Sequence, residues 1–373
     1  MEIVAWDMSR ELVRLGNSVR MITTALPDRR GEFMQDGVHV VPLQNIPSGC
    51  YSRAWWGASR AYFEQHCLTS TDAVLSVSAA AFGLLTVKPK LKDVPFIMQA
   101  HGTSWGEIVS KWHTGRLRSM VGSLRNLYWM PKDLWAYRHL DAIVAVGQRV
   151  YRDLEKAPSC WGWHSSKLHL INNGIDTGLF YPEPDAGADL RASVGIGAGA
   201  PLIISASRLH NQKGVQHGIR SFDKLVSQVP DAHYLIAGDG PERQALESLV
   251  RQLKLTDRVH FLGALDRGTL ARWLQVSDLF LFLTEHVEGL ALNVLEALAC
   301  GLPVIMSEHL QVIAPKATVL ANPRDLDTNA HLMARVIRNA SQRSRSSRLP
   351  TNFSLSHSVS QYIYLINRLR SGG

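Results

Sequence analysis

Residues 288–304 read EGLALNVLEALACGLPV, and this stretch does most to decide the fold. Two carboxylates, Glu288 and Glu296, lie in a segment whose other side chains are almost all apolar. We expect a buried helix that begins near Gly289, with Glu288 at its mouth and Glu296 in its second turn. An ionised carboxylate in an apolar, buried setting is costly unless another group satisfies it. The segment therefore predicts a site as well as a core helix.

The spacing of the two carboxylates excludes a glycosidase site. Residues 288 and 296 would be separated by about 12 Å of helical rise, whereas the two carboxyl groups of a glycosidase lie roughly 5–9.5 Å apart. We interpret Glu288 and Glu296 as two separate contacts to one long polar ligand. Free amides at the helix start, near Gly289, favour an anionic or oxygen-rich ligand. The alternative for Glu288 is a first-turn glutamate that only complements the helix dipole.

The second half of the chain alternates short apolar runs with amphipathic helical patterns. One helical face carries Val215, Ile219 and Phe222, between two such runs. Continuous apolar strands that alternate with helices indicate a parallel sheet covered on both faces, in a doubly wound α/β domain. The expected strands are 202–207, 233–240, 259–263, 279–284 and 303–307.

The first half follows the same alternation, and a linker separates the halves. Residues 172–189 are rich in Gly, Pro and Asp, which is typical of a domain boundary. We place the first domain at 1–174 and the second at 175–356, with a final helix within 354–370. The expected strands of the first domain are 19–24, 38–43, 73–78, 96–100, 142–147 and 168–172.

The chain opens on a helical pattern in which Val4, Met8, Leu12 and Leu15 share one face. In a doubly wound domain the first strand is central to the sheet. This chain shows no strand before its first helical pattern. We therefore predict that the strand at 19–24 lacks a neighbour in the sheet. The natural protein is therefore expected to have a strand before this helix.

Composition limits the classes of partner. The 373 residues carry a net charge of +8, with 46% hydrophobic and 19% charged residues, which favours anionic partners. A basic block of the kind that binds nucleic acid is missing, so nucleic acid is not expected. The four cysteines form no CxxC pair and no metal-ligand spacing. Together with the lack of a signal peptide or a long apolar run, this predicts a cytoplasmic protein.

Two polar loops follow expected strands at the sheet edge where open α/β folds bind ligands. In RLHNQKG (208–214), Arg208 supplies a planar fork and Lys213 a compact charge, which suits a pyrophosphate. The alternative is an ordinary solvated loop. In GDGPER (238–243), Gly238 and Gly240 permit close backbone approach, although Asp239 can equally be a turn residue.

One histidine is singled out by its position. His101 directly follows the expected strand at 96–100, so it lies at the carboxyl end of a strand, as do the two polar loops. The chain has 15 histidines, most of which must be structural or exposed. We expect His101 to be functional because of its place at the sheet edge.

These motifs together resemble the retaining glycosyltransferases of the GT-B fold, family 4 (group 1). The resemblance rests on their shared order and spacing over residues 2–305, and it weakens beyond. After PVIMS the family's Gly-Gly-x-x-Glu turn is replaced by EHLQVIAPK, and its first strand with the glycine-rich loop is missing. The motifs are HGT, NNGID, RLHNQKG, GDGPERQAL, DRVHFLG, EGLALNVLE and ACGLPVI.

The resemblance implies an architecture and a reaction. Two Rossmann-like domains would face each other across a cleft, an amino-terminal acceptor domain and a carboxyl-terminal donor domain, with residues 357–373 packing back on the first. The enzyme would transfer a sugar from a nucleotide sugar to an acceptor with retention of configuration. The alternatives are a non-catalytic or truncated, inactive nucleotide-sugar-binding homologue and a GT-B nucleotide-sugar epimerase or hydrolase.

The resemblance also implies roles for the residues. Glu288 would contact the donor sugar, Glu296 the ribose, and amides near Gly289 and Leu290 would assist. Arg208 and Lys213 would neutralise the departing diphosphate in place of a metal, so no metal or other cofactor is expected. His101 would touch the donor sugar or the acceptor.

The acceptor is expected to be a lipid-linked molecule or a polysaccharide, in cell-surface polysaccharide or glycolipid synthesis. Residues 105–140 interleave six cations with Trp105, Trp112, Trp129 and Trp135. Such a segment suits peripheral binding to the inner, anionic face of a membrane. The alternative is an amphipathic helix pair with a solvated face.

Overall fold

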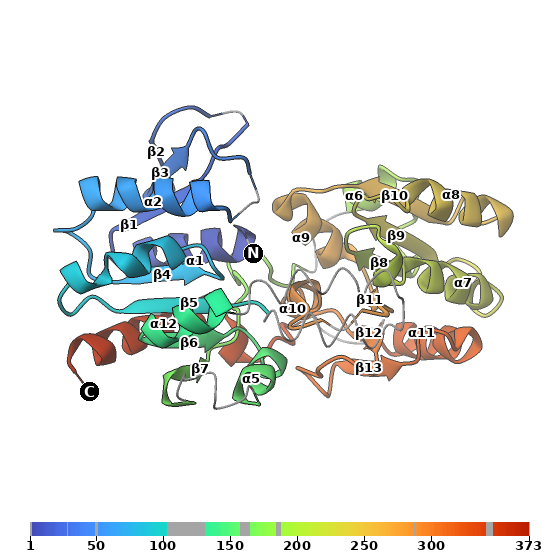
Figure 1. Cartoon of the computed structure of the whole chain (residues 1–373). Coiled ribbons are helices and arrows are strands. Elements are labelled where there is room, and N and C mark those ends of the chain that lie inside the picture. The colour runs from blue at the N-terminus through green and yellow to red at the C-terminus, as the bar shows by residue number, and fades with distance from the viewer. Residues whose placement is uncertain are drawn as a thin grey trace. The chain divides into compact units, whose positions relative to one another are not determined.

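The computed structural model describes residues 2–27, 29–48, 51–102, 131–156, 165–183, 188–286, 288–340 and 346–372 (Figure 1). The chain forms two compact units. The amino-terminal unit consists of Met1–Gly174 and Leu355–Gly373, and the carboxy-terminal unit consists of Ile175–Ser354. The sequence predicts that the chain passes between the domains after residues 174 and 356. In the structure it passes between the units after residues 174 and 354.

The amino-terminal unit contains mostly parallel strands, and the last helix of the chain packs against it. Residues 131–139 are also helical. Its helices and strands are α1 (Glu2–Arg14), β1 (Val19–Thr24), β2 (Phe33–Gln35), β3 (Val38–Leu43), α2 (Arg53–His66), β4 (Val74–Val77), β5 (Phe96–Ala100), β6 (Ala142–Ala145), α5 (Gln148–Glu155), β7 (Leu168–Leu170) and α12 (Leu355–Arg370).

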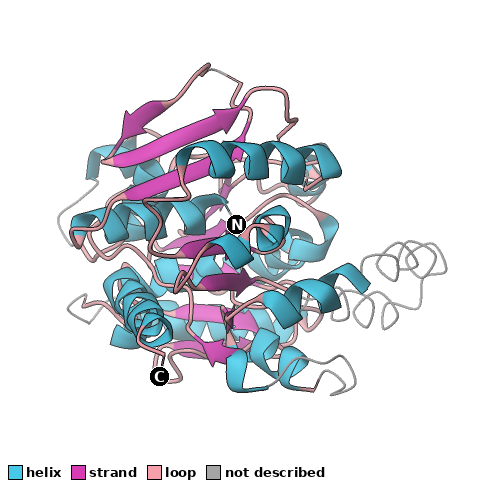
Figure 2. Cartoon of the chain, turned by 60° about the vertical axis from the view of Figure 1, so that its left-hand side comes forward, coloured by secondary structure: helices cyan, strands magenta, loops and turns pink. Residues whose placement is uncertain are grey.

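Alternate residues of the central strands of this unit face two different cores. Ile97 of β5 packs with Met8 of α1 and with Tyr362 of α12 in one apolar cluster. Its neighbours Phe96 and Met98 pack in a second cluster with α2 and α5. The side chains of a strand alternate between faces, so helices must cover both sides of this sheet. Figure 2 shows the strands in magenta among the cyan helices.

The strands of the amino-terminal unit form two separate sheets. Their orders are β1-β3-β2 and β4-β5-β6-β7. Among the described strands of this unit, β2 alone runs antiparallel to its neighbour. In the described ladders β1 pairs with β3 alone and β4 with β5 alone, so each is an edge strand. The strand at 19–24 thus lacks one neighbour, as the sequence predicts.

The carboxy-terminal unit is a six-stranded parallel sheet with helices on both faces. The strand order is β10-β9-β8-β11-β12-β13. Its elements are α6 (Ala188–Ala192), β8 (Leu202–Ala206), α7 (Val215–Val226), β9 (His233–Ala237), α8 (Arg243–Gln252), β10 (Val259–Gly263), α9 (Arg267–Val276), β11 (Leu279–Phe282), α10 (Leu292–Ala299), β12 (Val304–Ser307), β13 (Thr318–Ala321) and α11 (Leu326–Ala340).

The apolar runs of this unit are strands because both of their faces are buried. Every residue of β8 is buried. Leu202 and Ile204 face the cluster that includes α9 and α10, whereas Ile203 faces the cluster with α7, α8 and α11. The expected doubly wound α/β class is therefore confirmed.

Strands β2 and β13 and helices α6 and α11 were not predicted, whereas the remaining strands lie within or close to the expected ranges. β13 has one fully buried residue, Ala321. A short strand with this little burial lacks the continuous apolar signal that marked β8 and β11.

Much of the expected membrane segment falls outside the described residues, which resume at residue 131. Of its residues that are described, Trp135 is exposed, and the Lys132 ammonium lies 3.2 Å from the centroid of the Trp56 ring. No helix in the described ranges is both long and apolar enough to cross a membrane.

A histidine pair at the amino ends of β9 and β10 makes stability depend on pH. His233 Nδ1 lies 3.1 Å from His260 Nε2. Burial lowers the pKa of both rings below the ordinary histidine value, and for His233 the neighbouring His260 lowers it further. Protonation therefore favours the unfolded chain, so this contribution to stability is complete above about pH 6.5 and is lost as the pH falls.

We predict that His260→Gln reduces the loss of unfolding free energy between pH 7.5 and pH 5.5. Glutamine can keep a hydrogen bond to His233 but cannot be protonated in this range. The measurement is urea unfolding at both pH values, with His331→Gln on the exposed face of α11 as a control. A pH dependence equal to that of the wild type would contradict the assignment.

Candidate active site

The candidate site lies where the strand order of the carboxy-terminal unit reverses. From β8 the chain moves outward through β9 to β10, and from β11 it moves the opposite way through β12 to β13. β8 and β11 are paired in parallel, with Leu279 opposite Ile203. Open α/β sheets bind ligands beside the carboxyl ends of strands at such a reversal. The loops that follow β8 and β11 carry the predicted Arg208, Lys213 and Glu288.

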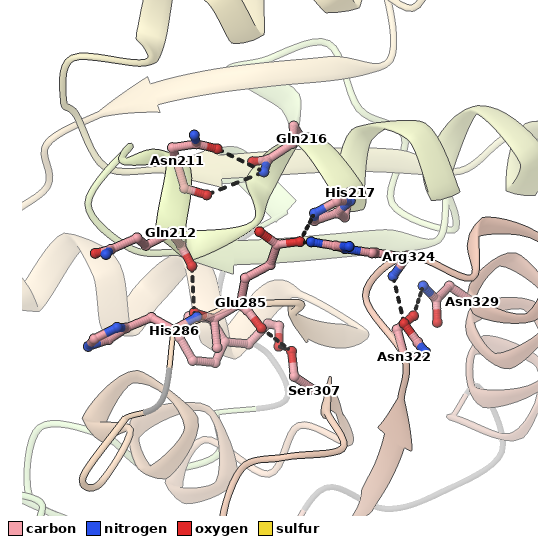
Figure 3. A network of polar contacts seen from close by, with 12 residues as sticks. Asn211, Gln212, Gln216, His217, Glu285, His286, Ser307, Asn322, Arg324 and Asn329 are labelled. Carbon is pink, nitrogen blue, oxygen red and sulfur yellow. Dashed lines mark hydrogen bonds and ion pairs between the residues drawn. The ribbon is translucent and has the colours of Figure 1, made fainter. Parts of the chain in front are cut away.

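One backbone carbonyl holds these two loops together. The carbonyl oxygen of Gln212 accepts hydrogen bonds from the amides of Glu285 and His286, at 3.0 and 3.2 Å, and from the hydroxyl of Thr284, at 2.8 Å. In Figure 3 a dashed line marks the hydrogen bond between Gln212 and His286. Lys213 follows Gln212 directly, so this junction fixes the backbone from which Lys213 extends.

A charged cluster supports the same junction from its far side. Glu285 Oε1 lies 3.2 Å from His217 Nε2 on α7 and accepts a 2.9 Å hydrogen bond from Arg324 Nε (Figure 3). Burial alone would raise the pKa of Glu285, but the Arg324 hydrogen bond and the nearby His217 lower it overall. Glu285 is therefore ionised near neutral pH. It ties α7 and the loop after β13 to the loop after β11.

Lys213 and Glu288 meet at this edge. Lys213 Nζ donates to Glu288 Oε1 at 2.5 Å, and the two side chains are 26% and 18% exposed. The ammonium also lies 5.8 Å from the centroid of the Phe282 ring. The sequence predicts that another group satisfies the Glu288 carboxylate, and in the structure Lys213 does so. A half-buried, charge-assisted pair of this kind is stronger than a surface ion pair.

Arg208 lies two residues beyond β8 and is exposed. Within the described part of the chain, none of the hydrogen bonds or ion pairs involves its guanidinium group. An exposed arginine close in sequence to a half-buried Lys–Glu pair leaves its five donors available to an anion.

Gly238 and Gly240 support the Arg208 loop. A β-carbon on Gly238 would lie 1.9 Å from the Ser207 carbonyl oxygen, and one on Gly240 would lie 2.3 Å from that of Leu209. These glycines are expected to allow close backbone approach. In the structure they approach the backbone of Ser207 and Leu209, the two neighbours of Arg208. Binding of the donor by the two glycines themselves remains a prediction.

The expectation that a helix begins near Gly289 is wrong. α10 begins at Leu292, because Ala291 has an extended backbone, with φ −80° and ψ 94°. Asn293 in its first turn donates from Nδ2 to the Ala206 carbonyl at 2.8 Å, which anchors the helix start to the end of β8. Glu288 therefore lies in a loop before the helix, as do Gly289 and Leu290. Their amides are not first-turn amides of α10.

Glu296 lies in the second turn of α10, as predicted, and it meets a residue that the sequence patterns missed. Arg267 Nη2 lies 3.8 Å from Glu296 Oε1, and the Arg267 guanidinium lies 5.2 Å from the centroid of the Phe180 ring. Arg267 is the first residue of α9, after the N-cap Asp266. Its position beyond the carboxyl end of β10 is the signal that could have identified it.

His101 belongs to the amino-terminal unit and follows β5 directly, as the sequence predicts. Its Nε2 lies 2.9 Å from Gln99 Oε1. Burial lowers the pKa of His101 to about 4. The ring is therefore neutral at physiological pH and can offer one nitrogen donor and one nitrogen acceptor.

No group of three or more His, Cys, Asp or Glu side chains is arranged to hold a metal ion in the ranges that the structure describes. The cations at the candidate site are side chains of the protein itself. Independence of metal remains a prediction.

Comparison with known proteins assigns the family. Residues 1–179 match the model of Glycosyltransferase Family 4, and residues 188–348 match the model of Glycosyl transferases group 1. The chain is 37% identical over 309 residues to N-acetyl-alpha-D-glucosaminyl L-malate synthase of Bacillus anthracis, covering 81% of this chain and 74% of that protein. The chain belongs to glycosyltransferase family 4. It is accordingly a glycosyltransferase.

A further family-4 relative matches over a shorter stretch. This is the GDP-mannose-dependent alpha-(1-6)-phosphatidylinositol monomannoside mannosyltransferase of Mycolicibacterium smegmatis. It is 33% identical over 147 residues, which cover 38% of each chain.

Solved structures agree on the GT-B fold. Sucrose-phosphate synthase of Thermosynechococcus elongatus superposes with a TM-score of 0.74 at 20% identity, over 100% of this chain and 94% of that one. HepE of Anabaena, solved in complex with UDP, gives 0.63 at 17% identity, over 84% of this chain and 81% of that one. At this identity the likeness concerns the fold alone.

We predict that Gly238→Ala destabilises this glycosyltransferase because the new methyl group collides with the Ser207 carbonyl. Gly195→Ala is the matched control: its φ of +74° is also left-handed, but its β-carbon would meet nothing within 4 Å. The control is expected to lose about 1–2 kcal/mol of unfolding free energy from backbone strain. Gly238→Ala should lose on the order of 1–3 kcal/mol more, the usual cost of overpacking. Equal losses in urea unfolding would contradict the close approach.

Proposed function

We propose that the enzyme transfers a sugar from a nucleoside diphosphate sugar to an acceptor hydroxyl with retention of anomeric configuration. The observation that carries the proposal is the 2.5 Å contact between Lys213 and Glu288 at the strand-order reversal, close in sequence to the exposed Arg208. The contact pairs a cation suited to a diphosphate with a carboxylate suited to sugar hydroxyls, and Arg208 offers a second cation on the same loop as Lys213.

Arg208 and Lys213 are proposed to bind the diphosphate and to stabilise its charge as it departs. An arginine fork matches two phosphate oxygens at once, and a lysine adds a point charge. When the bond to the sugar breaks, negative charge grows on the leaving phosphate. Fixed cations at that place lower the barrier without having to reorganise.

Glu288 is proposed to contact first Lys213 and then the donor sugar. In the structure its carboxylate balances the Lys213 ammonium. A bound diphosphate competes for that ammonium and leaves carboxylate lone pairs for the hydroxyls of the donor sugar. Glu296 is proposed to bind the ribose hydroxyls, with the positive charge of Arg267 3.8 Å from its carboxylate.

The proposed step exchanges one bond at the anomeric carbon for another. The bond from this carbon to the phosphate oxygen breaks, and a bond to the acceptor oxygen forms on the same face. The acceptor proton passes to the leaving phosphate oxygen, so atoms and charge balance. Retention follows from attack on the face that the diphosphate leaves.

The amino-terminal unit is proposed to bind the acceptor, with His101 touching the acceptor or the donor sugar. The acceptor is proposed to be a lipid-linked molecule or a polysaccharide. The name of the Mycolicibacterium smegmatis relative, a phosphatidylinositol monomannoside mannosyltransferase, supports the lipid-linked form. The cations and tryptophans of residues 105–140 support peripheral association with an anionic membrane.

The test is sugar release from UDP-N-acetylglucosamine, UDP-glucose and GDP-mannose, each with and without a membrane lipid extract. The proposal predicts that one donor is consumed much faster with the extract and that its sugar appears in a new α-linked product. Equal consumption without any acceptor would favour a hydrolase or epimerase. Nucleotide binding without consumption under either condition would favour a non-catalytic binding protein.

Two substitutions separate nucleotide binding from turnover. Glu296→Ala is expected to weaken binding of the nucleoside diphosphate, and Lys213→Ala to lower kcat about 100-fold or more with a smaller change in binding. Binding is measured by calorimetry and kcat with the donor identified above. Lys316→Ala, at an exposed lysine away from the site, is the control. Wild-type binding and kcat in both site variants would remove this assignment.

Activity is expected to survive removal of divalent metal, because Arg208 and Lys213 supply the charge that a metal would otherwise provide. The measurement compares kcat after dialysis against EDTA with kcat after Mg²⁺ or Mn²⁺ is returned. Loss of activity that either ion restores would contradict this prediction.

A further inference from the structure

A buried chain of polar side chains runs beneath His101 in the amino-terminal unit. Gln99 on β5, Asn173 after β7 and Tyr362 on α12 are 4%, 6% and 2% exposed. Their surroundings are apolar, since Tyr362 packs in the same cluster as Ile97. Buried amides and hydroxyls in such a setting are costly unless they bond to one another, so this chain has a definite arrangement.

The hydrogen bonds of Gln99 give its side-chain amide one orientation. Its Nε2 donates to the Tyr362 hydroxyl at 3.1 Å and to Asn173 Oδ1 at 3.4 Å. The amide nitrogen has two hydrogens, and these two acceptors take both. The amide oxygen is therefore the atom that faces His101, 2.9 Å from Nε2.

The orientation of Gln99 decides which ring nitrogen of His101 carries the proton. An amide oxygen only accepts hydrogen bonds, so His101 must donate from Nε2. The neutral ring then has its lone pair on Nδ1. With the amide reversed, the ring would accept at Nε2 and carry its proton on Nδ1.

We propose that Tyr362 is a positioning residue: it fixes the amide of Gln99, which in turn holds His101 as the Nε2–H tautomer and leaves Nδ1 to accept a hydrogen bond from a substrate hydroxyl. This inference rests on the role proposed above for His101. It gives the last helix a part in the reaction that its apolar packing does not reveal. The low pKa of His101 is consistent, because a neutral ring is the only form that has a choice of tautomer.

The test is the tautomer of His101, measured by its ring ¹⁵N shifts at pH 7 in the full chain. The wild type is expected to carry its proton on Nε2. Tyr362→Phe keeps the ring but removes the hydroxyl, so the amide of Gln99 loses a partner and the Nδ1–H form should become populated. Tyr364→Phe, on the same helix but 69% exposed, is the matched control and should leave the spectrum unchanged.

Kinetics supply the second readout. Tyr362→Phe is expected to lower kcat about tenfold, the effect of one hydrogen bond, with KM for the donor changed less than about twofold. Gln99→Glu keeps an acceptor beside Nε2 and should keep the tautomer. Its negative charge raises the pKa of His101, so the acid limb of kcat/KM should move up by about one pH unit or more.

The outcomes separate this inference from the proposed function. An Nδ1–H tautomer in the wild type, or an unchanged spectrum in Tyr362→Phe, overturns the positioning role. A changed tautomer with unchanged kcat overturns the claim that the tautomer serves the reaction. Failure of the wild type to transfer sugar overturns the proposed function, while the tautomer measurement still decides whether Tyr362 orients His101. Unfolding temperatures equal to that of the wild type show that each variant is folded.

Discussion

The site depends on the pairing of β8 with β11. These strands are far apart in sequence, yet Leu279 pairs with Ile203 and Phe280 with Ile204 in parallel register. Their carboxyl ends therefore emerge side by side, at the point where the strand order reverses. The loop after β8 supplies the cations and the loop after β11 supplies the carboxylate. This pairing brings Lys213 and Glu288, which are 75 positions apart in the sequence, within hydrogen-bond distance.

The junction between the two loops turns this pairing into a rigid site. The Gln212 carbonyl bonds to three groups of the facing loop, and Gly238 and Gly240 press against the backbone on either side of Arg208. Each of these contacts involves backbone, so none of them engages the charged ends of Arg208, Lys213 and Glu288. In the proposed reaction, loops fixed in this way would hold the charged residues so that developing charge is stabilised with little reorganisation. The Lys213–Glu288 pair balances both charges in the structure.

Sequence patterns predicted the features that rest on local signals. β8 and β11 are continuous apolar runs because both faces of the sheet are covered, and the polar loops that follow them lie at the carboxyl ends of the strands, where open α/β folds bind ligands. The start of α10 was misplaced because the extended backbone at Ala291 and the Asn293 bond to Ala206 are tertiary in origin.

The residues that sequence patterns missed act over long distances along the chain. Arg267 looks like an ordinary helix-start residue until the fold brings it to Glu296. Tyr362 looks like a core residue of an amphipathic helix, because its partner Gln99 is 263 positions away. Pairings at such separation leave no periodic trace in one sequence, so only the fold reveals them.

The most direct test of the central claim is a crystal structure of the protein with a nucleoside diphosphate bound. The account predicts diphosphate oxygens within hydrogen-bond distance of Arg208 and Lys213, with the ribose hydroxyls on Glu296. It also predicts that the Lys213 ammonium has turned from Glu288 towards the phosphate. A nucleotide bound elsewhere, with Lys213 still on Glu288, would contradict it.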